Sequence, residues 1–153
     1  AHMKTIYDQD SITADPGFMD SDAGDYRLRY DSSARELGIV DVDQLNMGLL
    51  ADFPFASTEA KPERLFVEVR ESISFTRMSQ GERIQTRVHL RNSDGVPVDA
   101  DPSELVWESR DVNSVAVDDN GMITALDKGV VEVHAKYTAN GATVSTFVHV
   151  IVD

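Results

Sequence analysis

Residues 65–153 predict an antiparallel β-sandwich of about seven strands, so the chain is expected to be all-β. Short runs of alternating apolar and polar residues recur along this part of the sequence. Such alternation over about four to eight residues marks a half-buried strand. Turn-forming sequences separate the runs, and no helical periodicity interrupts them. Several short strands at close spacing are typical of a two-sheet sandwich.

The first expected strands cover residues 65–70 and 82–91. The second of these alternates cleanly, which gives it an apolar face and a polar face. The polar face carries Arg83, Gln85, Arg87, His89 and Arg91. After a turn at 92–95, five further strands are expected, at residues 104–109, 114–117, 122–126, 130–138 and 142–152.

The last two strands are joined by Asn140-Gly141, the strongest short hairpin signal in the chain. A two-residue type I′ turn needs positive φ at both central residues, which Asn and Gly tolerate. The turn therefore predicts that Ala139 pairs with Ala142.

Composition excludes several classes of function. The 153 residues carry a formal net charge of -13 and include no cysteine. Contacts to phosphate need clustered Lys and Arg, so binding to nucleic acid or to anionic lipid is not expected. Disulfides and thiol chemistry are excluded, and no apolar run reaches the roughly 20 residues that span a membrane.

The chain divides into segments with different patterns. Residues 1–3, Ala-His-Met, have the form of a cloning remnant. Residues 4–57 are acidic and contain few strand-like runs. Residues 58–64 are polar, contain Pro62 and are expected to be a linker to the sandwich at 65–153.

The sandwich segment resembles the bacterial immunoglobulin-like domain, group 2. The resemblance lies in an ordered series of small motifs: a Trp with Ser two residues later, a Ser-x-Ala-x-Val strand, an Asn-Gly turn, a Lys-Gly turn and a β-branched strand. These residues are Trp107, Ser109, Ser114, Ala116, Val117, Asn120, Gly121, Ala125, Lys128, Gly129, Val131, Val133 and Ala135. The loop before Trp107 is longer than the family usually has.

That resemblance implies an immunoglobulin-like fold and an accessory module outside the cell or on the bacterial surface. Such modules occur in adhesins, invasins and multidomain carbohydrate-active proteins, and they imply no catalysis. We expect Trp107 in the core, and turns with positive φ at Gly121 and Gly129.

The opening segment resembles the closing rung of a right-handed parallel β-helix protein of the polysaccharide-lyase type, over about residues 12–48. The matching positions are Asp15, Pro16, Phe18, Gly24, Asp25, Tyr26, Leu28, Ser32, Ala34 and Gly38. Ser33 stands where that family usually has Pro.

This second resemblance implies an upstream β-helix domain of the same natural chain, which would hold the catalytic residues. A solenoid rung cannot bury its apolar face without a neighbour. Residues 4–55 are therefore expected to be loose, or to cap the sandwich through Leu49, Leu50, Phe53 and Phe55.

Acidic turns are the first candidate site. Counted from Asp20 as an EF-hand loop, Gly24 gives no ligand at position 5, Asp25 takes the Gly position and Asp31 replaces the usual Glu. The calcium motif fails. Turn residues that bond their own backbone account for this cluster, and also for Asp94, Asp99, Asp101, Asp118 and Asp119.

Two histidines form the second candidate. The hairpin register places His134 opposite Phe147 and Glu132 opposite His149, so the histidines become diagonal neighbours on one outward face. Together with Glu132 they could hold zinc. A Glu–His pair on a wet sheet explains the same residues, and no metal or other cofactor is assigned.

The third candidate is the basic row Arg83, Arg87 and Arg91, which could contact the carboxylates of a uronic-acid polysaccharide. Pairing with Glu68 and Glu71 on the preceding strand is the simpler explanation. Exposed aromatic side chains are the usual platform for sugars, and five could serve: Tyr26, Tyr30, Phe66, Tyr137 and Phe147.

The sequence shows no arrangement of residues that indicates catalysis, and we expect no enzyme. The preferred hypothesis is a monomeric accessory module that spaces or weakly anchors a polysaccharide-acting β-helix domain, with carbohydrate binding as one option. The alternative is an adhesion module that binds a host or matrix protein.

Overall fold

The computed structural model describes residues 11–50 and 52–153, so the expected cloning remnant at 1–3 lies outside the described residues. The described residues form two compact units, 11–41 and 42–153. Residues 42–64 group with the sandwich, whereas the sequence placed 4–57 in one segment. No helix among the described residues has the length and apolar character to cross a membrane.

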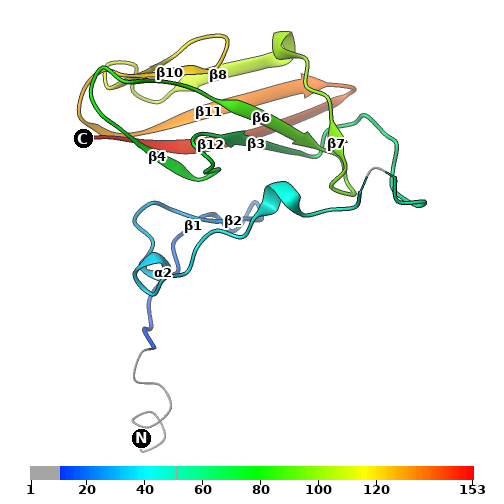
Figure 1. Cartoon of the computed structure of the whole chain (residues 1–153), viewed down its shortest axis with the longest axis horizontal. Helices are drawn as coiled ribbons and strands as arrows, with labels where there is room; N and C mark the ends of the chain where they lie inside the picture. Colours follow the sequence, from blue (N-terminus) through cyan, green and yellow to red (C-terminus); the bar gives the residue numbers. More distant parts are fainter. Residues whose placement is uncertain (1–10, 51) are drawn as a thin grey trace, which may run out of the picture. The chain divides into compact units, whose positions relative to one another are not determined.

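The first unit contains a small hairpin and one helical turn (Figure 1). Strand β1 (Phe18–Asp20) pairs antiparallel with β2 (Asp25–Leu28), and α2 (Ser33–Glu36) follows. Gly24 closes the connecting turn with a φ of 78°, and its N–H donates to the carbonyl of Ser21 at 3.2 Å. The acidic stretch is thus a hairpin turn.

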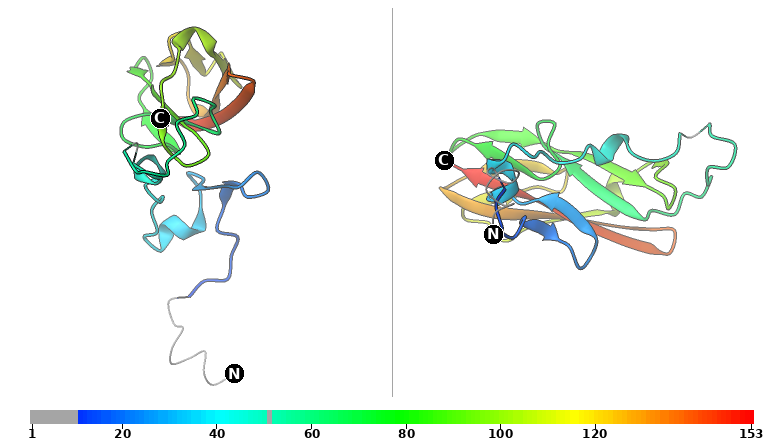
Figure 2. Two further views of the ribbon diagram at one scale, coloured as in Figure 1. Left: turned by 90° about the vertical axis from the view of Figure 1, so that its right-hand side faces the viewer. Right: turned by 90° about the horizontal axis from the view of Figure 1, so that it is seen from below.

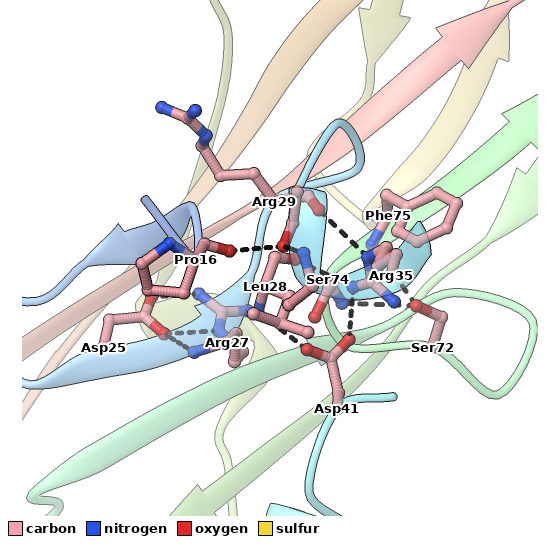
Figure 3. Close-up of polar contacts among 12 residues, drawn as sticks. Pro16, Asp25, Arg27, Leu28, Arg29, Arg35, Asp41, Ser72, Ser74 and Phe75 are labelled. Atoms are coloured by element: carbon pink, nitrogen blue, oxygen red, sulfur yellow. Dashed lines mark hydrogen bonds and ion pairs between the residues drawn. The ribbon is translucent and has the colours of Figure 1, made fainter. Parts of the chain in front are cut away.

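Residues 11–41 are held together by hydrogen bonds, whereas the sequence analysis expected a loose chain as one alternative. Asp41 accepts from the Leu28 N–H at 2.7 Å and from the Arg35 guanidinium at 2.8 Å (Figure 3). The guanidinium of Arg27 lies on the carboxylate of Asp25. These bonds tie the helical turn and its exit to the hairpin.

The second unit is a two-layer sandwich (Figures 1 and 2). One layer is a four-stranded sheet in the order β4 (Phe75–Met78), β12 (Ala142–Val152), β11 (Gly129–Ala139) and β8 (Leu105–Ser109). The other layer holds two three-stranded sheets: β3 (Arg64–Glu68), β6 (Arg87–Arg91) and β7 (Pro97–Val98); and β5 (Arg83–Gln85), β10 (Met122–Ala125) and β9 (Val115–Val117). Two 3-10 turns, η1 (Gln44–Asn46) and η2 (Pro102–Glu104), lie outside the sheets.

The all-β prediction is confirmed, and each of the seven expected runs contains a strand. The run 82–91 is divided into β5 and β6 at Thr86, whose N–H and hydroxyl both donate to the carbonyl of Gly121. The alternation predicted for this run is present, because Thr86 and Leu90 are buried while Arg83, Gln85 and Arg87 are exposed.

Two strands of the sandwich were not expected, β4 and β7. After β3 the backbone turns at Arg70 and Glu71, which have φ of 51° and 65°, and then crosses to the other layer as β4. There β4 runs parallel to β12, and the other described strand pairs of the sandwich are antiparallel as predicted.

The core lies between the two layers. It is built from buried side chains of both, among them Leu65, Val67, Ile123, Val133 and Val150. The last hairpin has the predicted register, with Ala139 opposite Ala142 and positive φ at Asn140 and Gly141. Trp107 packs against the core from β8 and remains half-buried.

Candidate functional site

The basic row stands on the outward face of β5 and β6. Arg87 lies opposite Glu68 of β3, and Arg91 lies opposite Arg64. Arg83 lies opposite Thr124 of β10, in the neighbouring three-stranded sheet. The row therefore begins on β5 in one three-stranded sheet and continues on the next strand, β6, in the other.

Glu68 binds the middle of this row. One carboxylate oxygen is 2.7 Å from Nε2 of His89, and the other is 3.7 Å from a terminal nitrogen of Arg87. The Glu68 side chain is only 12% exposed, whereas that of Arg87 is 76% exposed. The Glu68 carboxylate is thus a largely buried structural group, while most of the Arg87 side chain still faces solvent.

The ends of the row differ. The Arg91 guanidinium donates to the carbonyl of Leu45, which holds it against the backbone of the 42–64 segment. Arg83 is exposed, and no ion pair or hydrogen bond of its guanidinium occurs among the described contacts. Of the three arginines, Arg83 and Arg87 are exposed and can bind an external anion. Arg91 has a structural role, because its guanidinium bonds the Leu45 carbonyl.

The simpler explanation of the row therefore holds in part. Glu68 pairs with Arg87 as expected, but the described ion pairs include none between Glu71 and these arginines. A guanidinium can bind a carboxylate through two parallel hydrogen bonds. Two such groups, one on β5 and the other on β6, can bind an extended anionic chain.

The histidine pair forms a compact cluster on β11 and β12. The register places His134 opposite Phe147 and Glu132 opposite His149, as predicted. The two oxygens of Glu132 lie 2.9 Å from Nε2 of His134 and 3.8 Å from Nε2 of His149. His134 stacks on Phe147 with ring centroids 5.1 Å apart, and Phe147 meets His149 edge to face.

This cluster is a set of ion-pairing and ring contacts across the hairpin. Over residues 11–50 and 52–153, no group of three or more His, Asp or Glu side chains is arranged to hold a metal ion. The residues are nonetheless the ones that the hairpin register brings together, so the predicted neighbourhood is confirmed.

Asp101, Asp111 and Asp118 bond backbone groups of their own turns, whereas the Asp94 carboxylate accepts from the N–H of Ser57 in another segment. Asp118 accepts from the N–H groups of Asn120 and Met122 at 3.0 and 2.9 Å. The hydroxyl of Ser103, with the Ser103 N–H, lowers the pKa of Asp101. The hydroxyl of Ser114, with the Asn113 N–H, lowers the pKa of Asp111. These carboxylates stabilise turns.

The aromatic residues proposed as sugar platforms have mostly structural positions. Phe66 and Tyr137 are 6% and 4% exposed, so neither can present a ring face. The Tyr137 hydroxyl accepts from the Asp101 N–H at 3.2 Å. Tyr30 and Phe147 are half-buried, and Tyr26 is 60% exposed.

One exposed feature was assigned the wrong role from sequence. Leu49, Leu50, Phe53 and Phe55 do not cap the sandwich, because they are 37%, 74%, 46% and 85% exposed. The segment follows Gly48, contains Pro54 and shows no alternation of apolar and polar residues, so it carries no strand pattern from which burial could be predicted. A lone apolar segment does not reveal from sequence whether it is buried.

Comparison with known proteins assigns no family. No protein-family model matches the chain, and no curated protein matches it. Among solved structures, the chain is similar to the S-layer protein rSbsC, with a TM-score of 0.45 and 13% sequence identity. The match covers 61% of this chain and 15% of the length of that protein. Similarity of this size does not establish a shared fold.

Proposed function

We propose that this chain is a non-catalytic accessory module of a secreted or cell-surface bacterial protein. In this proposal, residues 65–153 are a bacterial immunoglobulin-like domain of group 2, and about residues 12–48 are the exit of a β-helix domain that acts on polysaccharide. The module spaces that domain or anchors it weakly to its substrate.

The role of the motif residues carries the proposal. Trp107 packs against the core, and the hydroxyl of Ser109 donates to the carbonyl of Val115 at 2.6 Å. Gly121 lies against Trp107, and Ser114 bonds Asp111. The residues that distinguish this sequence therefore maintain the sandwich, which supports a structural module whose contacts are made by its surface.

Carbohydrate binding is the finer part of the proposal. Arg83 and Arg87 are the exposed members of the basic row, in a chain whose net charge is otherwise strongly negative. Uronic acids carry one carboxylate per sugar, so an acidic polysaccharide offers repeated partners to spaced guanidinium groups.

Titration against a glycan panel tests this proposal. The protein is titrated with oligosaccharides of polygalacturonate and alginate, and with neutral glucans as controls, while amide resonances are followed by NMR. We expect shifts around β5 and β6 with the acidic glycans only. The double substitution Arg83→Ala and Arg87→Ala should abolish the shifts.

The matched control is Arg110→Ala. Arg110 is also exposed and paired with a glutamate, Glu108, but it lies at the end of β8. Its removal changes the net charge without touching the basic row. If no resonance moves at millimolar glycan, or if the control weakens binding as much as the double substitution does, carbohydrate binding by this row is wrong.

A further inference from the structure

Exposed apolar side chains are concentrated in one short part of the second unit. Among the described residues of 42–153, ten large hydrophobic side chains are exposed, and six of them fall between positions 42 and 55. They are Val42, Met47, Leu49, Leu50, Phe53 and Phe55. Singly exposed apolar residues are normal on a protein surface, whereas a contiguous exposed apolar patch marks an interaction site.

A loop projects from this segment, and one residue closes its base. We call it the 49–57 loop; its described residues are 49–50 and 52–57. The carbonyl of Asp94 accepts from the Leu49 N–H at 3.0 Å, and the Asp94 carboxylate accepts from the Ser57 N–H at 2.7 Å. Asp94 therefore holds both ends of the loop at the turn between β6 and β7.

The base is fixed further by neighbours of Asp94. The buried amide of Asn92 donates to the carbonyl of Ser57 at 3.0 Å. Gly48 and Gly95 pack backbone to backbone, so closely that a β-carbon on Gly95 would lie 2.7 Å from the Cα of Gly48. The loop thus leaves the sandwich from a rigid, close-packed base, as compact functional loops do.

The loop also has internal order. The Phe53 N–H donates to the carbonyl of Leu50 at 3.0 Å, and the Ala56 N–H donates to the carbonyl of Phe53 at 2.9 Å. The rings of Phe53 and Phe55 meet edge to face, with centroids 6.1 Å apart. Pro54 between them restricts the backbone. Two aromatic rings are thus held near each other while the Phe55 side chain remains 85% exposed.

Charge limits what can cover these rings. Residues 42–60 contain Asp43, Asp52 and Glu59 and include no Lys or Arg. Anionic lipid and nucleic acid would be repelled, and a second copy of this chain would add its own net charge of -13. An apolar pocket with a rim of Lys and Arg complements both the rings and the carboxylates.

We propose that the 49–57 loop is a docking element for a partner protein. Leu50, Phe53 and Phe55 enter an apolar pocket of the partner, and basic residues at the pocket rim face Asp52. Aromatic anchors in a desolvated pocket carry most of the binding energy of protein interfaces. This inference goes beyond the spacer role and does not depend on binding of carbohydrate.

A library of displayed random peptides serves as the probe. The whole chain is immobilised, and bound peptides are selected and sequenced. We expect enrichment of peptides that combine aliphatic or aromatic residues with Lys or Arg. The affinity for an enriched peptide is then measured by fluorescence anisotropy. The double substitution Phe53→Ser and Phe55→Ser should lower this affinity by about tenfold or more. Asp52→Asn should reduce the loss of affinity on adding salt.

The matched control is Val112→Ser. Val112 is 64% exposed and lies between β8 and β9, outside the loop. Affinity should be unchanged in this variant. Because all substituted side chains are exposed, all the variants should melt like the parent protein.

Several results would overturn the proposal. One is an enriched peptide that binds the double variant as well as the parent. Another is a concentration-dependent dimer, seen by sedimentation, that the double substitution abolishes, because the occupant would then be a second copy. A third is loop-dependent partition into phosphatidylcholine vesicles, which would make the loop a membrane anchor. None of these results depends on the glycan titration.

Discussion

The indole ring of Trp107 lies directly against Gly121. A β-carbon on Gly121 would come within 2.6 Å of Cζ2 of Trp107 and within 2.5 Å of the Thr86 hydroxyl. Trp107 belongs to the four-stranded layer, while Gly121 and Thr86 lie beside β10 and β5 in the other layer. This contact therefore joins the two layers, and it requires a residue without a side chain.

Gly121→Ala should destabilise the sandwich by about 2–4 kcal/mol, from overpacking together with the cost of a non-Gly residue at positive φ. The φ of Gly121 is 76°. Gly141→Ala is the matched control, because Gly141 has a φ of 73° and nothing lies within 4 Å of the added β-carbon. It should cost only about 1 kcal/mol, the backbone part.

Urea unfolding followed by the fluorescence of Trp107, the single tryptophan of the chain, measures both variants. Equal losses in the two variants would show that the packing against Trp107 contributes nothing.

Asn92→Asp should destabilise the second unit by about 2–4 kcal/mol, the usual cost of leaving buried polar groups unpaired. Asn92 is 2% exposed. Its amide nitrogen donates to the carbonyls of Ser57 and Glu59, and its amide oxygen accepts from the N–H groups of Asp94 and Val96. An ionised carboxylate keeps the two accepted bonds but places an acceptor against two carbonyls.

Hydrogen exchange checks where the Asn92→Asp effect acts. The Ser57 amide should exchange faster, because the end of the loop loses its anchor beside Asn92. The amide of Val133 in the core should change only through global unfolding. If urea unfolding and exchange at Ser57 both match the parent protein, the amide bonds to this segment do not stabilise the fold.

Strand alternation and turn chemistry made much of the sandwich predictable. The Asn140-Gly141 turn fixed the register of β11 and β12 over its whole length, and so placed Glu132, His134 and His149 together. The alternation in residues 82–91 placed Arg83 and Arg87 on an exposed face. These relationships depend on neighbouring residues, or on a turn that sets the pairing of the two strands it joins. They can therefore be predicted from the sequence.

Non-local relationships were not predictable. Strand β4 depends on a change of layer at Arg70 and Glu71, which are not residues that favour positive φ. The anchoring of the 49–57 loop depends on Asn92 and Asp94, which are 35 and 37 positions from Ser57 along the chain. The sequence around Phe55 resembles that of a buried segment, and only the fold shows that this ring is exposed.

Ser114→Ala should raise the pKa of Asp111 toward its ordinary value. The Ser114 hydroxyl is the larger cause of the lowered pKa, and the Asn113 N–H is the second. A lowered folded pKa means that Asp111 contributes stability above its unfolded pKa and that this contribution is lost as the pH falls through the folded pKa. The variant should lose it at a higher pH.

An NMR titration of the Asp111 carboxyl carbon measures this change directly. Asp101 provides an internal control, because the Ser103 hydroxyl and N–H lower its pKa independently of Ser114. An Asp111 titration curve that does not move in the variant would contradict the assigned cause.

Residues 62–153 should fold alone but should be less stable than residues 42–153. The buried hydrophobic cluster runs from Leu65 to Val152, so the shorter fragment retains it whole. The fragment loses the carbonyl partners of Asn92 at Ser57 and Glu59, and that of Arg91 at Leu45. Water replaces these partners, so the expected loss is about 1–3 kcal/mol. Urea unfolding of the two fragments measures the difference. A molten shorter fragment would show that residues 42–61 are part of the domain itself, and equal stability would show that this segment only rests on its surface.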